Sequence, residues 1–377
     1  MNKIFILNDH AVVMGGADAV AVSQYKDFKK SGLDVTLCSV VDEGLQKNTD
    51  DLIGYPLHPR YFLRNLFWIK AYKKVKKLFI LNDISIYIIH SWTKQLSSSI
   101  FYALRGKKVY IVAHDYFLVC PNGGLYNYNK KQKCNVRGGG AKCLSINCDK
   151  SSYWIKIYRW LRFWIQTYGI KICNPQIIAL NELQVRLFAH FPRVQLLKNK
   201  IDQDFCFPEI NSSNRKYLTY IGRGDPEKGV SVLGDRKLIS SLPIMVIGPD
   251  KGSLGPSFEN VIYTGWLSEG DIRRHIDQTL IGIFPSLWNE VDPLTPWKFF
   301  SRGIPVACSI ENIFGQFMVI KIPELVYSNV NELNLLLQKI EDKIFYDKLC
   351  EKVKDLYVSE VEIRADIWSR GFNEIIN

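Results

Sequence analysis

The segment Tyr220-Ile-Gly-Arg-Gly-Asp-Pro-Glu-Lys-Gly229 places two cations and several glycines where a predicted strand ends. Gly222 and Gly224 let the backbone turn tightly, and Arg223 and Lys228 bring positive side chains beside the start of a predicted helix. Two cations together with free backbone N–H groups at a helix N-terminus suit a diphosphate. The alternative is a surface turn with solvated charges, but the position directly after a strand favours the diphosphate site.

A second loop between a predicted strand and a predicted helix runs from Phe284 to Lys298 and carries the carboxylate of Glu290. Asp292 followed by Pro293 fits the N-cap and the first residue of that helix. The loop would therefore present Glu290 together with backbone N–H groups. A carboxylate there can accept hydrogen bonds from sugar hydroxyls, and the alternative is an ordinary exposed glutamate.

Four cysteines, Cys120, Cys134, Cys143 and Cys148, fall in one Gly- and Lys-rich segment. Because no export signal is predicted, we expect thiols or metal ligands rather than disulfides. Four thiols indicate a structural zinc site that would fix the loop. The spacings of 13, 8 and 4 intervening residues lack the CxxC pairs of common zinc sites, so thiols packed as small apolar groups are the alternative.

Short apolar runs alternate with amphipathic stretches along the chain, which predicts parallel sheets covered by helices. The first-half strands are expected at Lys3–Leu7, Asp34–Val40, Ile84–His90, Lys108–His114, Ile177–Leu180 and Val194–Leu197, with a helix over Gly16–Lys30. After a polar linker at Pro208–Arg215, the second-half strands are expected at Tyr217–Ile221, Ile244–Ile247, Val261–Thr264, Leu280–Phe284 and Ile304–Cys308. The pattern predicts two doubly wound, Rossmann-like domains facing across a cleft, with ligands at the carboxyl ends of the strands.

The domains are expected over residues 1–207 and 208–360. A C-terminal helix at 361–377 is expected to pack back on the first domain. The formal net charge of +12 points to anionic partners such as phosphates, nucleic acid or acidic lipids. No apolar run reaches the length of a membrane span or a signal-peptide core, so we predict a cytoplasmic protein.

In the order of its motifs the chain resembles the family 4 retaining glycosyltransferases of the GT-B fold, over nearly its whole length. The similar motifs are Gly15-Gly16-Ala17, His114-Asp115, Asn199-Lys-Ile-Asp202, Gly222 to Gly229, and Glu290 with Gly303-Ile-Pro-Val306. They correspond in turn to the family's glycine-rich loop, N-domain histidine, domain-junction motif, Gly-Arg…Pro-Glu-Lys-Gly element and two-glutamate motif. At the junction, Lys200 stands where the family has glycine.

The resemblance implies that the domain over residues 1–207 lies on the acceptor side and the domain over residues 208–360 on the nucleotide-sugar side. It implies that Arg223 and Lys228 hold the diphosphate of the donor and stabilise the departing nucleotide. It implies that Glu290 binds hydroxyls of the transferred sugar, and that His114 approaches this sugar from the first domain. No metal would be needed for the chemistry. The donor-binding set that it implies is Gly15, Gly16, Gly222, Arg223, Lys228, Glu290, Pro293, Leu294 and Lys298.

The function implied is retaining hexosyl transfer from a UDP- or GDP-sugar to a glycan or lipid-linked acceptor in surface polysaccharide or lipopolysaccharide biosynthesis. One position departs from the family: its second glutamate contacts the ribose, and here the residue is Lys298, which cannot accept hydrogen bonds. Either ribose is held differently, or Lys298 meets an anionic group, or it is simply a solvated lysine, or donor binding has been lost. The last alternative would make the protein a non-catalytic nucleotide-sugar-binding or scaffold relative.

Two other classes fit less well. A nicotinamide-dependent oxidoreductase needs G-x-G-x-x-G spacing, which Gly15-Gly16 lacks. A nucleic-acid-binding protein would use the charge and the aromatic residues but would not need Glu290 in register with the Gly-Arg segment, so we expect no nucleic-acid partner.

Two basic stretches bear on location. From Arg60 to Phe79 there are seven Lys and Arg residues and no acid, and the stretch from Tyr153 to Tyr168 is rich in Trp, Tyr and Ile around three cations. Basic helices with aromatic residues bind the surface of anionic membranes, which predicts a peripheral position on the inner face of the cell membrane. The alternative is a helix that packs its aromatic side on a sheet and leaves its lysines in water.

Overall fold

The computed structural model describes residues 3–10, 13, 15–40, 51–54, 66–80, 85–93, 96–201, 207, 215–249 and 261–376. The chain divides into two compact units. Unit 1 comprises residues 1–125, 135–199 and 367–377, and unit 2 comprises residues 126–134 and 200–366. Most of the expected linker at 208–215 and the Asp202 end of the junction motif lie outside the described residues.

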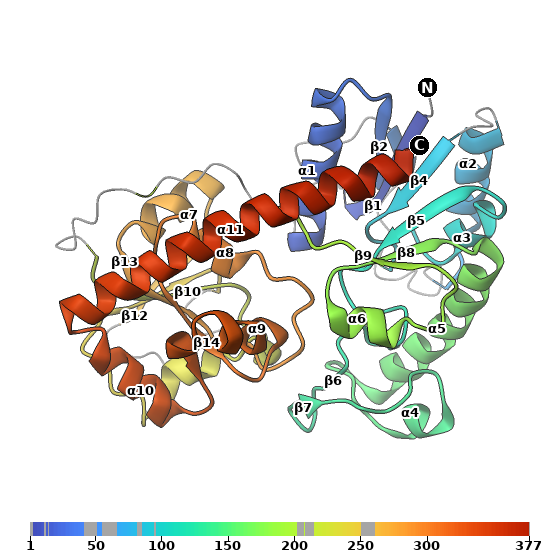
Figure 1. The fold of residues 1–377 in the computed structure, drawn as a ribbon. Coiled ribbons are helices and arrows are strands. Elements are labelled where there is room, and N and C mark those ends of the chain that lie inside the picture. Colours follow the sequence, from blue (N-terminus) through green and yellow to red (C-terminus); the bar gives the residue numbers. More distant parts are fainter. Residues whose placement is uncertain are drawn as a thin grey trace. The chain divides into compact units, whose positions relative to one another are not determined.

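Unit 1 contains a seven-stranded parallel sheet in the order β3-β2-β1-β4-β5-β8-β9 (Figure 1). The strands are β1 (Lys3–His10), β2 (Val35–Val40), β3 (Asp51–Gly54), β4 (Ser85–Ile89), β5 (Lys108–Val112), β8 (Gln176–Ala179) and β9 (Val194–Leu196). The central strands are apolar on both faces because helices cover both, as is usual for parallel sheets. Six of the seven follow predicted runs, and β3 was not predicted.

The helices of unit 1 are α1 (Gly16–Lys30), α2 (Ile69–Ile80), α3 (Ser99–Ala103), α4 (Ala141–Ser145), α5 (Tyr153–Cys173) and α6 (Glu182–Leu187). Helices α2, α3 and α5 bury their apolar sides in one cluster against alternate residues of the sheet, including Phe5 and Leu7 of β1. Ser152 caps α5 by accepting a hydrogen bond from the Ile155 N–H, and Asn174 ends the helix in the left-handed conformation. Part of α11 (Lys343–Ile376) also belongs to this unit: the Trp368 indole donates to the Lys198 carbonyl.

Unit 2 contains a six-stranded parallel sheet in the order β12-β11-β10-β13-β14-β15. Its strands are β10 (Tyr217–Ile221), β11 (Ile244–Ile247), β12 (Val261–Gly265), β13 (Thr279–Phe284), β14 (Val306–Ser309) and β15 (Val326–Tyr327). The first five follow predicted runs, while β15 is too short for periodicity to reveal. A separate two-stranded antiparallel ribbon, β6 (Tyr126–Asn127) with β7 (Gln132–Lys133), was also not predicted.

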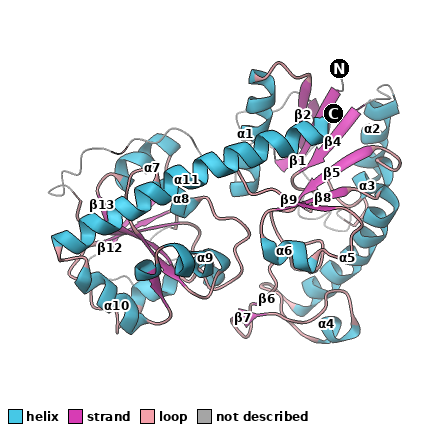
Figure 2. Cartoon of the chain, in the orientation of Figure 1, coloured by secondary structure: helices cyan, strands magenta, loops and turns pink. Residues whose placement is uncertain are grey.

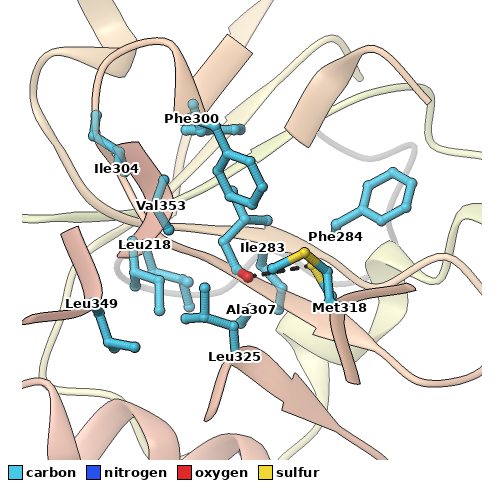
Figure 3. Close-up of a cluster of buried hydrophobic side chains, with 14 of the residues drawn as sticks. Leu218, Ile283, Phe284, Phe300, Ile304, Ala307, Met318, Leu325, Leu349 and Val353 are labelled. Atoms are coloured by element: carbon cyan, nitrogen blue, oxygen red, sulfur yellow. Dashed lines mark hydrogen bonds between the residues drawn. The ribbon is translucent and has the colours of Figure 1, made fainter. Parts of the chain in front are cut away.

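The helices of unit 2 are α7 (Glu269–Ile276), α8 (Thr295–Phe300), α9 (Ile313–Lys321), α10 (Val330–Lys339) and most of α11. Figure 2 shows helices on both sides of the strands. The core joins strand residues such as Leu218 and Ile283 to Phe300 of α8, Met318 of α9 and Val353 of α11 (Figure 3). None of the described helices in either unit has the length and apolar composition needed to cross a membrane.

Two local predictions were wrong. No α-helix follows the Tyr220 segment: two short 3-10 turns, Pro226–Lys228 and Val230–Gly234, stand in its place. Helix α8 begins at Thr295 after Leu294, not after Asp292. Asp292 cannot cap it because both of its carboxylate oxygens bind the buried Arg364 guanidinium, at 3.1 and 3.0 Å.

Candidate active site

An ion pair between Lys228 and Glu290 joins the ends of two neighbouring strands of unit 2. Lys228 follows β10, Glu290 follows β13, and these strands are hydrogen-bonded to each other in the sheet. The Lys228 Nζ atom lies 2.6 Å from Glu290 Oε1, and the Ser286 hydroxyl donates to the same oxygen at 2.8 Å. The sequence predicted both charged residues as site residues, and the fold brings them into direct contact.

The Glu290 carboxylate is almost entirely buried, and burial alone would raise its pKa. The nearby Lys228 ammonium and the hydrogen bonds that the carboxylate accepts outweigh burial and hold the pKa below its ordinary value. Glu290 is therefore ionised at neutral pH. The Lys228 ammonium also lies 5.4 Å from the centre of the Trp288 ring, within cation–π range. The site thus holds a fixed, ionised acceptor beside a fixed cation.

The loop that carries Glu290 is attached directly to the turn that carries Lys228. The Leu287 N–H donates to the Glu227 carbonyl at 2.9 Å. Gly229 has a φ of +69°, and a Cβ atom there would lie 1.9 Å from the Pro285 carbonyl oxygen, so only glycine permits this approach. The Asn312 side chain donates to the Ser286 carbonyl at 3.0 Å and supports the loop from α9. The residues that sequence reasoning missed, Ser286 and Asn312, have no local pattern that marks them.

Arg223 extends from the other side of the same turn. Its guanidinium lies 3.0 Å from the Asp225 carboxylate, and its side chain is 56% exposed. The Tyr220 hydroxyl donates to the Arg223 carbonyl at 2.6 Å and fixes the backbone there. The turn therefore holds one enclosed cation, Lys228, and one exposed cation, Arg223. The predicted helix N-terminus is absent here, because a 3-10 turn of three residues, Pro226–Lys228, takes the place of the helix.

The remaining predicted donor residues of unit 2 lie in the segments that follow β10 and β13. Gly222 directly follows β10, and its N–H donates to the Ile247 carbonyl of β11. Pro293 and Leu294 precede α8, and Lys298 lies on it. The Lys298 ammonium is 2.5 Å from both carboxylate oxygens of Glu269 on α7. The chain itself thus supplies an anionic partner for Lys298.

In unit 1, His114 belongs to a chain of three hydrogen-bonded side chains. Gln24 Oε1 lies 2.6 Å from His90 Nε2, and His90 Nδ1 lies 2.8 Å from His114 Nε2. Burial lowers the pKa of His114 to about 4, and burial together with His114 holds the pKa of His90 well below its ordinary value, so both rings are neutral. Because the Gln24 oxygen only accepts, His90 Nε2 donates, His90 Nδ1 accepts, and His114 Nε2 donates. His114 is thus left with an unprotonated Nδ1.

Asp115, the next residue, has a buried carboxyl group. Its Oδ1 accepts a hydrogen bond from the Phe117 N–H at 2.9 Å, and the Gln184 side chain holds its backbone carbonyl. Burial raises the pKa of Asp115 to about 7, although the Phe117 N–H and the Arg162 guanidinium both oppose this. Asp115 therefore changes charge near neutral pH, beside His114.

Replacing Asp115 by Asn is expected to remove a pH-dependent destabilisation of unit 1. A carboxyl whose pKa rises on folding destabilises the folded state as pH rises from its unfolded value toward pH 7. The free energy of unfolding of Asp115→Asn minus that of the wild type should therefore increase by about 2 kcal/mol from pH 5 to pH 8. This value allows for the partial solvent exposure of Asp115, which weakens the effect of burial. Urea denaturation at both pH values measures this. A constant difference between the two proteins would contradict the raised pKa.

Gly15 and Gly16 lie at the start of α1, with Gly15 in the N-cap position. A Cβ atom at either residue would meet nothing within 4 Å. The fold of unit 1 therefore does not itself require glycine here. The open space is what a phosphate or an acceptor would need for close approach.

Three of the four clustered cysteines gather in unit 1, and Cys134 groups with unit 2. Cys143 Sγ accepts from the Lys156 ammonium at 3.1 Å, and the Asn122 side chain contacts the sulfurs of Cys120 and Cys148 at 3.0 and 3.4 Å. Lys156 is fully buried among them. No three His, Cys, Asp or Glu side chains of the described residues could hold a metal ion. The arrangement supports packed thiols rather than the zinc alternative in this part of the chain.

No family model matches the chain, and no curated protein matches it by sequence. Solved structures do match its fold. A sucrose-phosphate synthase from Thermosynechococcus elongatus has a TM-score of 0.71 and 14% identity, covering 100% of this chain and 99% of its own. WaaG, a glycosyltransferase involved in lipopolysaccharide biosynthesis, has a TM-score of 0.64 and 14% identity, covering 94% and 95%. Anabaena HepE in complex with UDP and glucose has a TM-score of 0.65 and 12% identity, covering 98% and 99%.

These likenesses extend over nearly the full length of each chain, and with the two parallel sheets they define the fold. The protein has the GT-B fold, as the sequence predicted. At identities of 14% and below, the comparisons concern the fold alone. What the protein does has to be argued from its own side chains.

Proposed function

We propose that the protein is a glycosyltransferase that moves a hexosyl group, with retention of configuration, from a nucleoside-diphosphate sugar to a glycan or lipid-linked acceptor. The observation that carries the proposal is the Lys228–Glu290 pair at the ends of β10 and β13, with the exposed Arg223 guanidinium on the same turn. The site combines cations for a diphosphate with an ionised acceptor for sugar hydroxyls. The GT-B fold supports it by analogy.

The cations would act on the leaving group. Negative charge grows on the diphosphate as the glycosidic bond breaks, and prearranged cations stabilise that charge most where water is excluded. Lys228 is held in place by Glu290, so its ammonium needs no rearrangement of the loop to meet a phosphate. Arg223 has donors in a planar fork that suits phosphate oxygens. No metal is assigned a step in this proposal.

Glu290 and His114 would act on the transferred sugar. The hydrogen bonds from Lys228 and Ser286 both end on Glu290 Oε1, so the proposal assigns Oε2 to a sugar hydroxyl. The unprotonated His114 Nδ1 would accept a hydrogen bond from another hydroxyl, because burial keeps the ring neutral. Gly15 and Gly16 would give a phosphate or an acceptor room to approach. Pro293, Leu294 and Lys298 complete the proposed donor-binding set.

The pathway proposed is the synthesis of surface polysaccharide or lipopolysaccharide. Support comes from two of the similar structures, WaaG and an outer core galactosyltransferase, WaaB, whose names refer to lipopolysaccharide. HepE in complex with UDP-glucose supports a uridine donor, and GDP-sugars remain within the proposal. The rival proposal, a non-catalytic scaffold, is favoured by Lys298 in place of the second glutamate.

The test is the melting temperature of the purified protein with UDP, GDP, ADP, dTDP and their common sugar conjugates. A ligand at 100 times its dissociation constant adds about 2.7 kcal/mol to the free energy of unfolding, which is a clear shift. A shift with one base supports the donor site and selects the substrate for assay. No shift with any of them would overturn the proposal.

Arg223→Ala is expected to lower donor hydrolysis or transfer by about 10- to 100-fold, because one of the two diphosphate cations is lost. Its free energy of unfolding should stay close to that of the wild type, since the Arg223 side chain is mostly exposed. Release of nucleoside diphosphate measures the rate. Arg236→Ala removes another exposed arginine of unit 2 and is the matched control. Binding without turnover in the wild type would favour the scaffold.

A further inference from the structure

One face of helix α5 exposes large apolar side chains from Tyr153 to Tyr168. Trp154 is 79% exposed, Tyr168 is 61% exposed, and Tyr153, Leu161 and Trp164 are exposed with them. From Trp154 to Tyr168 the face runs about 21 Å, at 1.5 Å per residue. The opposite side of the helix packs into the core, so the exposed apolar face is not needed to hold α5 on unit 1. We call these five residues the α5 aromatic face.

Helix α2, in the same layer, exposes lysines. Helix α3 packs against both α2 and α5, and all three bury their inner sides in one cluster on the same face of the sheet (Figure 1). Among the described side chains of α2, the exposed ones are Ile69, Lys70, Lys73, Lys76 and Lys77. None of the three helices contains an acidic residue. The layer therefore combines an aromatic face with a cluster of cations.

The positive charge of the whole chain is concentrated around this layer. Residues 66–175 contain 19 Lys and Arg and only three acids, whereas the rest of the chain contains 30 basic and 34 acidic residues. Of the three acids, Asp149 is buried and paired with Arg159, and Asp115 is the residue next to His114 described above. The net positive charge of the chain thus lies in residues 66–175, most of which belong to unit 1.

A bilayer with anionic head groups matches both features. Trp and Tyr side chains are favoured at the boundary between head groups and acyl chains, and lysines nearby are attracted to acidic lipids. A soluble acidic partner would explain the lysines but not five large apolar side chains along one helix. We propose that the outer surface of the α2, α3 and α5 layer docks on an anionic membrane, with the α5 aromatic face in the head-group region. The proposal does not depend on the proposed function, because no residue of the donor site takes part.

Co-sedimentation with vesicles tests the proposal. The full chain is mixed with vesicles of phosphatidylcholine, or of phosphatidylcholine with 30% phosphatidylglycerol, at 20 mM and 500 mM NaCl. We expect the protein to pellet with the anionic vesicles at low salt and not with the neutral ones. At high salt the pelleted fraction should fall, because salt screens the attraction between the lysines and the acidic head groups.

Variants assign the binding to this surface. Trp154→Ala combined with Tyr168→Ala, and separately Lys70→Gln, Lys73→Gln and Lys77→Gln together, should each reduce the pelleted fraction at least five-fold. The matched controls are Trp266→Ala, which removes a 69% exposed tryptophan from unit 2, and Lys339→Gln with Lys343→Gln and Lys348→Gln. Unchanged melting temperatures show that the variants fold. The proposal is wrong if the wild type does not pellet, or if the α5 variant or the lysine variant pellets like the wild type.

Discussion

Lys228→Met is expected to reduce glycosyl transfer by about 100- to 1000-fold and to destabilise the protein by about 3–5 kcal/mol. The rate falls because the enclosed cation no longer opposes the charge on the departing diphosphate. The stability falls because the Glu290 carboxylate stays buried without its ammonium partner at 2.6 Å, and only Ser286 still donates to Oε1. Nucleotide release under saturating donor and urea denaturation at pH 7 measure the two effects.

Adding Glu290→Gln to Lys228→Met separates the two effects. The double variant has no unpaired charge, so most of the lost stability should return, while transfer stays low because the cation is still missing. The pH dependence provides a second control. Since the pKa of Glu290 is lowered on folding, its ion pair contributes stability above the unfolded value and loses it as pH falls through the folded value. Full activity of Lys228→Met with a stable fold would contradict the assigned role.

The strands and the charged residues of the site could be predicted because their signals are local. Tyr217–Ile221 and Ile244–Ile247 have the predicted bounds, since a strand buried on both faces is a continuous apolar run between polar turns. The Gly-Arg segment and Glu290 each follow such a strand. Parallel strands place their carboxyl ends at one edge, so their contact followed from the topology.

The partners of these residues could not be predicted, because long-range packing selects them. His90 contacts Gln24 on one side and His114 on the other only after α1, β4 and β5 are packed together, and nothing in the neighbourhoods of Gln24 and His90 marks them. Asp292 was expected to cap a helix, a local preference, but the distant Arg364 takes its carboxylate. A strong tertiary ion pair outweighs a capping hydrogen bond of about 1 kcal/mol. The zinc prediction found no support, and here too a residue distant in sequence determines the surroundings of the side chain. Lys156, 13 residues beyond Cys143, donates a hydrogen bond to the Cys143 sulfur.

Gly229→Ala is expected to destabilise the protein by about 3 kcal/mol or more and to abolish most of the transfer. The left-handed conformation at φ +69° costs an alanine about 1–2 kcal/mol. The added Cβ would also lie 1.9 Å from the Pro285 carbonyl oxygen, so the loop that carries Ser286 and Glu290 has to move away from the turn that carries Lys228. Urea denaturation and nucleotide release measure both losses.

Two other glycines separate backbone strain from displacement of the loop. Gly32 has a φ of +75° but open space around its Cβ position. Gly32→Ala should therefore lower the free energy of unfolding only by the cost of the left-handed backbone, about 1–2 kcal/mol. Gly270 lies in helix α7 with nothing within 4 Å, and Gly270→Ala should stabilise the protein by about 0.5–1 kcal/mol through helix propensity. Neither variant should change transfer. If Gly229→Ala cost no more than Gly32→Ala and left transfer intact, the approach of the two loops would not hold the Lys228–Glu290 pair in place.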